Sequence, residues 1–151
     1  MFDEVDIDLG RCRKRMRAGK AFFDTNVLLY LLSAGTKADK AEALLAGGGV
    51  VSVQVLNEFA SVARRKLKMT WPEIREILAT IRGICEVIPV TVEIHEAGLA
   101  IAERYGFSIY DSLIPAAAKE AECRTVYSEG MQDGQVVYGV AIRNPFARER
   151  N

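Results

Sequence analysis

The stretch Ala21-Phe22-Phe23-Asp24-Thr25-Asn26-Val27-Leu28-Leu29-Tyr30 decides the fold expected for this chain. Its first three residues form a short apolar run, which is typical of a buried strand. Asp24 interrupts the run and a second apolar segment follows, so we expect a strand over residues 21–23 and a helix that begins near Asn26. Asp24 would therefore lie where the first strand ends and the first helix starts.

Downstream of residue 30, short apolar runs alternate with longer helical stretches. Residues that commonly cap helices precede four of these stretches: Ser52, Thr70, Thr91 and Ser108. We expect strands at residues 50–51, 86–88, 125–127 and within 136–142, and helices over residues 37–46, 52–68, 70–82, 91–106 and 108–122. Crossovers of this length favour parallel strands with helices on both faces. The predicted fold class is α/β, a three-layer α/β/α sandwich with a central parallel sheet.

The composition indicates one globular domain without a strong charge bias. The chain has 151 residues, half of them hydrophobic, which is enough for one core and too short for two ordinary domains. Its 20 basic and 20 acidic side chains cancel, so any attraction to phosphate must be local. Three distant cysteines without Cys-x-x-Cys spacing fit a reducing compartment. With no apolar run of membrane-spanning length, we expect a cytoplasmic protein that does not enter the membrane.

The N-terminal segment differs from the rest of the chain. An acidic start between Asp3 and Asp8 precedes a basic cluster: Arg11, Arg13, Lys14, Arg15, Arg17 and Lys20. Such a segment is either an arm that contacts RNA or a solvated charge run, and the second is more common at a terminus. We expect a flexible extension over residues 1–20, one domain over residues 21–147 and a tail over residues 148–151.

Three acidic residues are candidates for a functional site, although each has a simpler structural explanation. Ligands of open parallel sheets gather beyond the carboxyl ends of the strands, where Asp24 is expected, but Asp24 also suits a helix N-cap. Asp111 lies in Ser108-Ile109-Tyr110-Asp111, which has the form of a capping box. Glu58 points away from the apolar stripe of its helix and would, taken alone, be a solvated glutamate. None of the three establishes a site by itself.

Four motifs change this interpretation: Phe23-Asp24-Thr25-Asn26-Val27-Leu28-Leu29-Tyr30, Asn57-Glu58-Phe59, Tyr110-Asp111-Ser112-Leu113-Ile114 and Tyr127-Ser128-Glu129. In this order they resemble the motifs of bacterial PIN-domain ribonucleases, the VapC-type toxins of type II toxin–antitoxin systems. The resemblance covers residues 21–146. It implies a central parallel sheet and a pocket in which Asp24, Glu58 and Asp111 are the catalytic residues and hold Mg²⁺ or Mn²⁺ for RNA cleavage.

The residue types suit that chemistry, because hard divalent cations prefer oxygen ligands and Mg²⁺ relies on few carboxylates. In such sites metal ions activate a water molecule and offset the charge that builds on the phosphate. Asn26 matches a polar position of the first motif, where it either orients a water or carboxylate or caps its own helix. The resemblance also implies an antitoxin partner, whose C-terminal segment lies across the pocket, and a homodimer.

One position departs from the family pattern. Relatives commonly carry an aspartate directly after the Ser-Glu pair, whereas Gly130 follows Ser128-Glu129 here. The missing charge should weaken a second metal ion more than the first, so we expect reduced or absent nuclease activity. Glu129 or Asp133, in the same loop, is a candidate to substitute in part. Pro115, inside a predicted helix, should bend that helix near Asp111.

Two other classes of protein fit less well. A catalytically silent PIN module would keep an antitoxin partner or RNA affinity without cleavage, and mutation of Asp24 separates it from an enzyme. A receiver-type signalling domain needs an acidic pair after the first strand, which Thr25-Asn26 does not supply. The basic cluster Arg64-Arg65-Lys66-Lys68 suits the carbonyl end of its helix and could also touch RNA phosphates, and the first explanation is favoured.

Overall fold

The computed structural model describes residues 19–147, so the expected tail and nearly all of the expected N-terminal extension lie outside the described residues. Within that range six strands form one sheet in the order β3-β2-β1-β4-β6-β5. The strands are β1 (Phe22–Phe23), β2 (Gly49–Ser52), β3 (Cys85–Ile88), β4 (Thr125–Tyr127), β5 (Val136–Val137) and β6 (Val140–Arg143). All neighbours pair in parallel except β5 and β6, which form an antiparallel hairpin.

The sheet is the predicted central parallel sheet, with one antiparallel hairpin added at its edge. Only Tyr138 and Gly139 connect β5 to β6, and both have a positive φ, 47° and 82°. A two-residue connection with two positive φ angles joins antiparallel strands, whereas parallel strands need a long crossover. The departure is confined to one edge of the sheet, away from β1.

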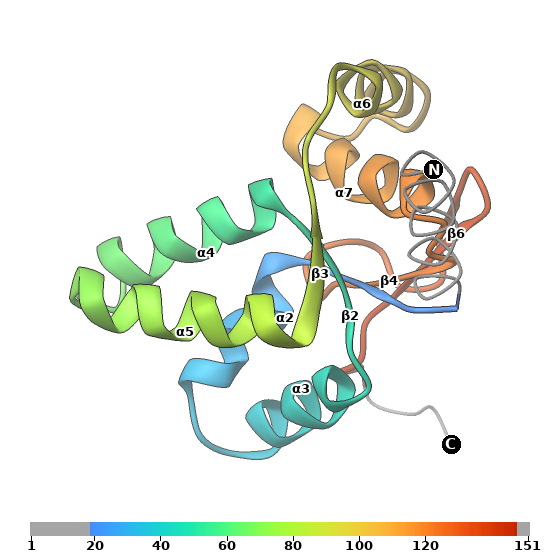
Figure 1. The fold of residues 1–151 in the computed structure, drawn as a ribbon. Helices are drawn as coiled ribbons and strands as arrows, with labels where there is room; N and C mark the ends of the chain where they lie inside the picture. The colour runs from blue at the N-terminus through green and yellow to red at the C-terminus, as the bar shows by residue number, and fades with distance from the viewer. Residues whose placement is uncertain (1–18, 148–151) are drawn as a thin grey trace, which may run out of the picture.

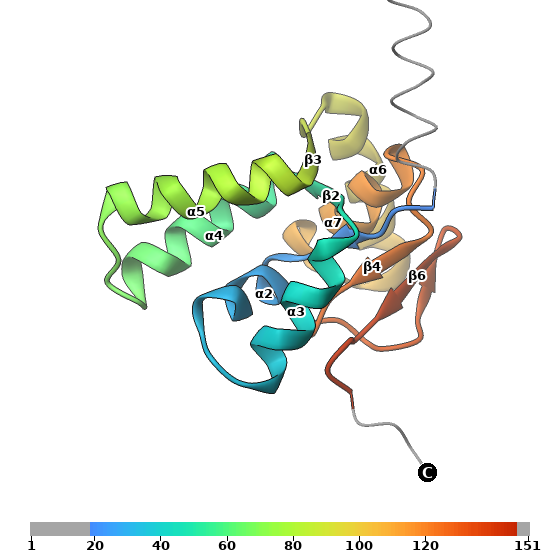
Figure 2. The ribbon, with the colours of Figure 1, turned by 60° about the horizontal axis from the view of Figure 1, so that its bottom comes forward.

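Helices cover both faces of this sheet, as the α/β/α prediction requires. They are α2 (Thr25–Leu29), the 3-10 turn η1 (Tyr30–Leu32), α3 (Thr36–Ala46), α4 (Val53–Arg65), α5 (Trp71–Ile84), α6 (Val92–Tyr105) and α7 (Ile109–Glu120). Helices α6 and α7 lie together on one side, and α2 and α3 lie on the other (Figures 1 and 2). The antiparallel α4–α5 pair projects sideways from the sheet. No helix within residues 19–147 is both long and apolar enough to cross a bilayer.

The helix starts follow the predicted caps. The side chains of Asp24, Ser52, Thr70, Thr91 and Ser108 each accept a backbone N–H in the first turn of the following helix. Helix α7 continues through Pro115 without interruption.

Helix α4 ends earlier than expected, at Arg65 instead of Lys68. Lys68 adopts a left-handed φ of 56°, and the Met69 N–H donates to the Ala63 carbonyl, which closes the helix. Leu67 therefore lies beyond the helix and is half exposed. The buried residues of α4 are Val55, Phe59 and Ala63.

A close approach between β1 and β2 fixes the centre of the sheet. A Cβ at Gly49 would lie 2.2 Å from the Phe23 ring, so only glycine fits there. Of the neighbouring glycines, Gly47 is the C-cap of α3, whereas Gly49 is required by this contact with Phe23. Strand β1 is therefore buried in the interior of the sheet, and Asp24 is the residue that directly follows it.

Candidate active site

Asp24 lies at the carboxyl ends of two neighbouring parallel strands. It follows β1 directly, and its N–H donates to the Tyr127 carbonyl at the end of β4 (3.0 Å). One carboxylate oxygen accepts the Thr25 N–H (2.7 Å) and the other accepts the Ser128 hydroxyl (2.8 Å). Asp24 is thus the expected N-cap of α2, but its second oxygen is tied to the end of β4, which a cap does not require.

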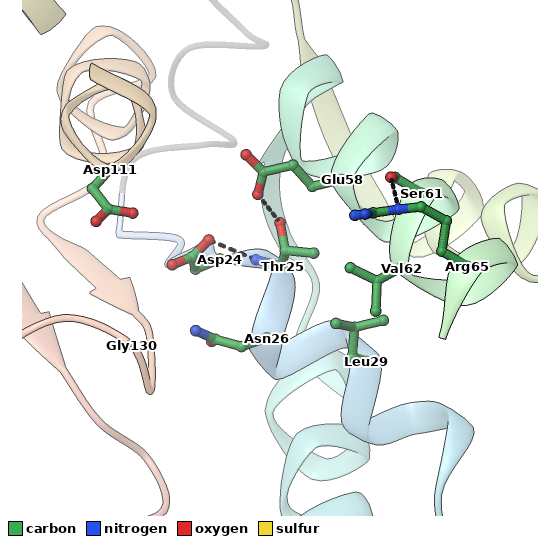
Figure 3. A pocket seen from close by; sticks show the side chains of 10 residues that line it. All are labelled: Asp24, Thr25, Asn26, Leu29, Glu58, Ser61, Val62, Arg65, Asp111 and Gly130. Carbon is green, nitrogen blue, oxygen red and sulfur yellow. Dashed lines mark hydrogen bonds between the residues drawn. The ribbon is translucent and has the colours of Figure 1, made fainter. Parts of the chain in front are cut away.

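A pocket of about 360 Å³ opens beside Asp24 (Figure 3). Its lining residues are Asp24, Thr25, Asn26, Leu29, Glu58, Ser61, Val62, Arg65, Asp111 and Gly130. The three predicted acidic residues reach it from the end of β1, the middle of α4 and the start of α7, and their carboxylates face a common space. We call this cavity the acidic pocket.

Glu58 is held in the acidic pocket by two hydrogen bonds. The Thr25 hydroxyl donates to one carboxylate oxygen and the Gln54 amide donates to the other, both at 2.9 Å. Glu58 is therefore not a freely solvated glutamate. Sequence reasoning did not single out Thr25 or Gln54; the position of Gln54 one helical turn before Glu58 was the available signal.

Asp111 shows why the capping explanation is incomplete. Its N–H donates to the Ser108 hydroxyl, as in the capping box of α5. In α5, however, the Glu73 carboxylate also bonds back to the Thr70 N–H, whereas the Asp111 carboxylate forms no hydrogen bond or ion pair with residues 19–147. The Asp111 side chain faces the pocket instead of capping its helix.

The acidic pocket carries uncompensated negative charge. Burial raises the pKa of the Asp24 carboxyl, hydrogen bonds from Ser128 and the Thr25 N–H lower it, and the nearby Glu58 and Asp111 carboxylates raise it again. No basic side chain within residues 19–147 forms an ion pair with these three acids. A cation would therefore be favoured in the pocket.

One cation does line the pocket without pairing to a carboxylate. The Arg65 Nε donates to the Ser61 hydroxyl (3.1 Å), and the rest of the guanidinium extends toward the open space (Figure 3). The sequence favours helix-end electrostatics over contact with RNA phosphates for the basic cluster and does not single out Arg65. The early end of α4 and the contact with Ser61 give Arg65 a position that the other members of the cluster do not share.

The chemistry of the donors, three carboxylates, suits a hard divalent cation such as Mg²⁺ or Mn²⁺. In the part of the chain that the structure describes, no three acidic, histidine or cysteine side chains lie close enough together to hold a metal ion as they stand. Mg²⁺ is commonly held by one or two carboxylates and several waters, so hard oxygen donors spaced around an open cavity meet its requirements. Asp24, Glu58 and Asp111 are the residues that would hold it.

The supporting residues divide into two groups. Asn26 lines the pocket, and its side-chain oxygen accepts the Glu129 N–H (3.0 Å), so it fixes the loop after β4. Gly130 also lines the pocket. Glu129 and Asp133 point elsewhere: Glu129 binds Tyr30 and Lys37, and Asp133 accepts the Asn144 N–H. Neither carboxylate therefore supplies the negative charge that is absent at Gly130.

A family model described as PIN domain matches residues 21–131, and the chain belongs to this family. No curated protein matches the chain significantly.

Solved structures show the same fold at low sequence identity. Mycobacterium tuberculosis VapC20, described as a sarcin-ricin loop cleaving toxin, is 20% identical, with a TM-score of 0.60, over 72% of this chain and 88% of that one. A toxin–antitoxin complex from Klebsiella pneumoniae is 21% identical (TM-score 0.65; 83% and 98% coverage). VapBC2 from Rickettsia felis, bound to a promoter DNA fragment, is 17% identical (TM-score 0.61; 82% and 97%).

Proposed function

We propose that this chain is a VapC-type toxin, a metal-dependent ribonuclease that hydrolyses RNA phosphodiester bonds. One observation carries the proposal: three carboxylates from separate elements of a PIN domain line one pocket, and none of them forms an ion pair within residues 19–147. The structural likeness to a described RNA-cleaving toxin supports it. The substrate class, the activity and the metal are expectations that experiment must test.

The residues of the chain would prepare the pocket for Mg²⁺ or Mn²⁺ and for a phosphate. Asp24, Glu58 and Asp111 would hold the ion, which supplies water activation and charge compensation when it is bound. Thr25 and Ser128 fix the orientation of Asp24 through its two oxygens. Positioned ligands of this kind reduce the reorganisation needed when substrate arrives.

Arg65 would bind the RNA phosphate in this proposal. A guanidinium offers several N–H donors in a planar fork that matches phosphate oxygens. The Ser61 hydroxyl occupies only the Nε–H of Arg65, so the terminal donors remain available at the pocket. With metal on the acidic side and Arg65 opposite, the pocket would hold a phosphate between two positive groups.

The glycine at position 130 supports a second candidate function: the chain is a weakened or catalytically silent member of the same family. Gly130 lines the pocket at the position where relatives commonly carry an aspartate, and neither Glu129 nor Asp133 turns toward it. A site with three carboxylates would keep one metal ion better than two. Such a chain would bind metal and RNA but cleave slowly or not at all.

The partners expected for this function are an antitoxin protein and a second copy of the chain, in the cytoplasm. The likeness to solved toxin–antitoxin complexes supports the antitoxin. The buried cysteine Cys85 is free, which fits a reducing compartment. Co-expression with the neighbouring gene product, followed by mass measurement of the purified complex, tests both partners.

The function is tested by calorimetric titration with Mn²⁺ and by cleavage of a labelled RNA with and without Mg²⁺. Asp24→Asn should abolish Mn²⁺ binding and any cleavage, because it removes the charge at the centre of the pocket. Asp39→Asn, in the first turn of α3 and outside the acidic pocket, is the matched control and should leave both unchanged. Mn²⁺ binding without cleavage supports the silent module. Equal Mn²⁺ binding by Asp24→Asn and the parent chain would refute both candidates.

A further inference from the structure

A second hollow opens directly beside the acidic pocket. It has a volume of about 640 Å³ and shares Glu58 and Ser61 of α4 with that pocket. We call it the side groove; its lining residues are Val53, Gln54, Asn57, Glu58, Ser61, Pro89, Val90 and Tyr110. Because the two cavities adjoin, a strand whose phosphate lies in the acidic pocket would place a neighbouring nucleotide at the side groove.

An exposed aromatic ring borders the side groove. Tyr110 is 67% exposed, and its side chain makes no ring contact or hydrogen bond with residues 19–147. Its backbone is nevertheless anchored, since the Tyr110 carbonyl accepts the Gln54 amide of α4 (3.2 Å). The groove also presents exposed Val53 and Val90. A ring with free faces on an anchored backbone suits stacking against a flat partner.

The groove also offers an unused amide. Asn57 is exposed at the groove, and its side chain has no hydrogen-bond partner within residues 19–147. A carboxamide both donates and accepts, as the edge of a nucleobase does. Gln54, in contrast, already spends its donor group on Glu58 and Tyr110. The ring for stacking, Tyr110, therefore comes from α7, and the amide that can bind the edge of a base, Asn57, comes from α4.

We propose that the side groove is a nucleobase-binding subsite, which takes one unpaired base of an RNA strand whose phosphate lies in the acidic pocket. The base stacks on Tyr110, and Asn57 binds its edge. A nucleobase is favoured over a protein partner because the groove continues into a pocket suited to phosphate and pairs one free ring with one free amide. The placement of the strand rests on the proposed function, but base binding itself does not require cleavage.

The test measures binding of labelled hexauridylate RNA in Ca²⁺, and of the same strand with one abasic residue at successive positions. In the parent chain one abasic position should weaken binding about tenfold, because stacking on an aromatic ring is lost there. Tyr110→Ala should weaken binding of the intact strand by the same factor and remove the dependence on that position. Tyr110→Phe should bind like the parent. Tyr138→Ala, an exposed tyrosine on the β5–β6 turn, is the matched control.

Asn57→Ala should leave hexauridylate affinity within a few fold but reduce discrimination among strands of different base. The proposal is overturned if Tyr110→Ala weakens every abasic strand equally, if no strand binds, or if the variant changes only the molecular mass in solution, which would indicate an interface between copies. If the chain cleaves RNA but its binding does not depend on the abasic position, the subsite is rejected and the ribonuclease proposal stands. Abasic-dependent binding without cleavage supports the subsite and counts against the ribonuclease.

Discussion

The three acids of the acidic pocket differ from Glu129, whose N–H donates to the pocket residue Asn26, in how their charge is balanced. Asp24, Glu58 and Asp111 line the acidic pocket without an ion-paired cation within the described residues. Glu129, in contrast, accepts hydrogen bonds from Lys37 (2.9 Å) and from the Tyr30 hydroxyl (2.6 Å).

This difference separates a site from a structural contact. The hydrogen bond from the Tyr30 hydroxyl, followed by the contact with Lys37, lowers the pKa of Glu129, so its charge already has partners in the folded chain. The Asp24 carboxyl has its pKa raised by burial and by two neighbouring carboxylates, so its charge is unfavourable until something else enters. Unbalanced charge in a cavity indicates a binding site, whereas the balanced pair stabilises the chain. Four changes test this contrast.

The largest effect on RNA binding is expected from Arg65→Ala. Loss of a phosphate-binding guanidinium should weaken RNA binding about tenfold or more, because charge-assisted hydrogen bonds are the stronger kind. Mn²⁺ affinity should stay the same or increase, since a positive charge leaves the pocket. Arg64→Ala is the control: Arg64 donates to the Met69 carbonyl, packs over Trp71 and does not line the pocket. Equal losses of RNA binding in the two variants would mean that the helix end attracts RNA only as a diffuse charge.

Gly130→Asp should tighten Mn²⁺ binding by about tenfold, because it adds a fourth charge to the acidic group. A Cβ at Gly130 meets only the Asn26 amide nitrogen, at 3.1 Å, which a small movement of that side chain relieves. Gly130→Asn has the same shape without the charge and should not change the affinity. Calorimetry gives the affinity, and RNA cleavage shows whether activity rises with it. No gain in either measurement would remove Gly130 as the cause of weak activity.

Asp24→Asn should stabilise the metal-free chain by about 1 kcal/mol at neutral pH, although it abolishes metal binding. The raised pKa means that the folded state favours the protonated carboxyl, so the ionised form lowers stability above the folded pKa. As the pH falls to the unfolded value, about 3.9, this disadvantage disappears and the two chains should converge. Urea unfolding between pH 4 and pH 8 measures the difference. Lower stability of Asp24→Asn at neutral pH would mean that the cap outweighs the repulsion.

The sequence predicts those parts of the fold that depend on near neighbours. The caps at Ser52, Thr70 and Thr91 act within one helical turn, so their residue types sufficed. The predicted end of α4, near Lys68, was too late, because lysine seldom adopts the left-handed φ that closes the helix here. The extended runs within residues 136–142 were expected, but their antiparallel pairing was not, because neither strand is longer than four residues and so short a pattern does not define a partner.

The site required information from distant parts of the chain. Asp24 could be placed by physical argument alone, at the end of the first strand, but Glu58 resembled a solvated residue and only the family motifs indicated otherwise. The hydrogen bonds that fix Glu58 come from Thr25, 33 residues away, and from Gln54. Glu129 was a candidate substitute for the missing aspartate because it is adjacent in sequence. Its carboxylate instead binds Lys37, 92 residues away in the sequence.

Glu129→Gln should give the smallest effect and the opposite sign to Asp24→Asn. The amide loses the ion pair with Lys37, so the chain should be destabilised at neutral pH by no more than about 1 kcal/mol, because the pair is partly exposed and screened by water. The lowered pKa means that the contribution of Glu129 is present above its unfolded value, about 4.3, and is lost as the pH falls through the folded value. Added salt should reduce the difference.

Asp24→Asn and Glu129→Gln, compared in the same urea titrations, test most directly the difference between the acidic pocket and Glu129. Each replaces one carboxylate with a side chain of the same shape, so packing cancels and the sign reports the electrostatic environment. Asp24→Asn should gain stability and lose Mn²⁺ binding, while Glu129→Gln should lose stability and keep Mn²⁺ binding. If both variants lost stability and both kept the metal, the acidic pocket would be as well balanced as the Lys37 pair, and no cation would be needed to complete it.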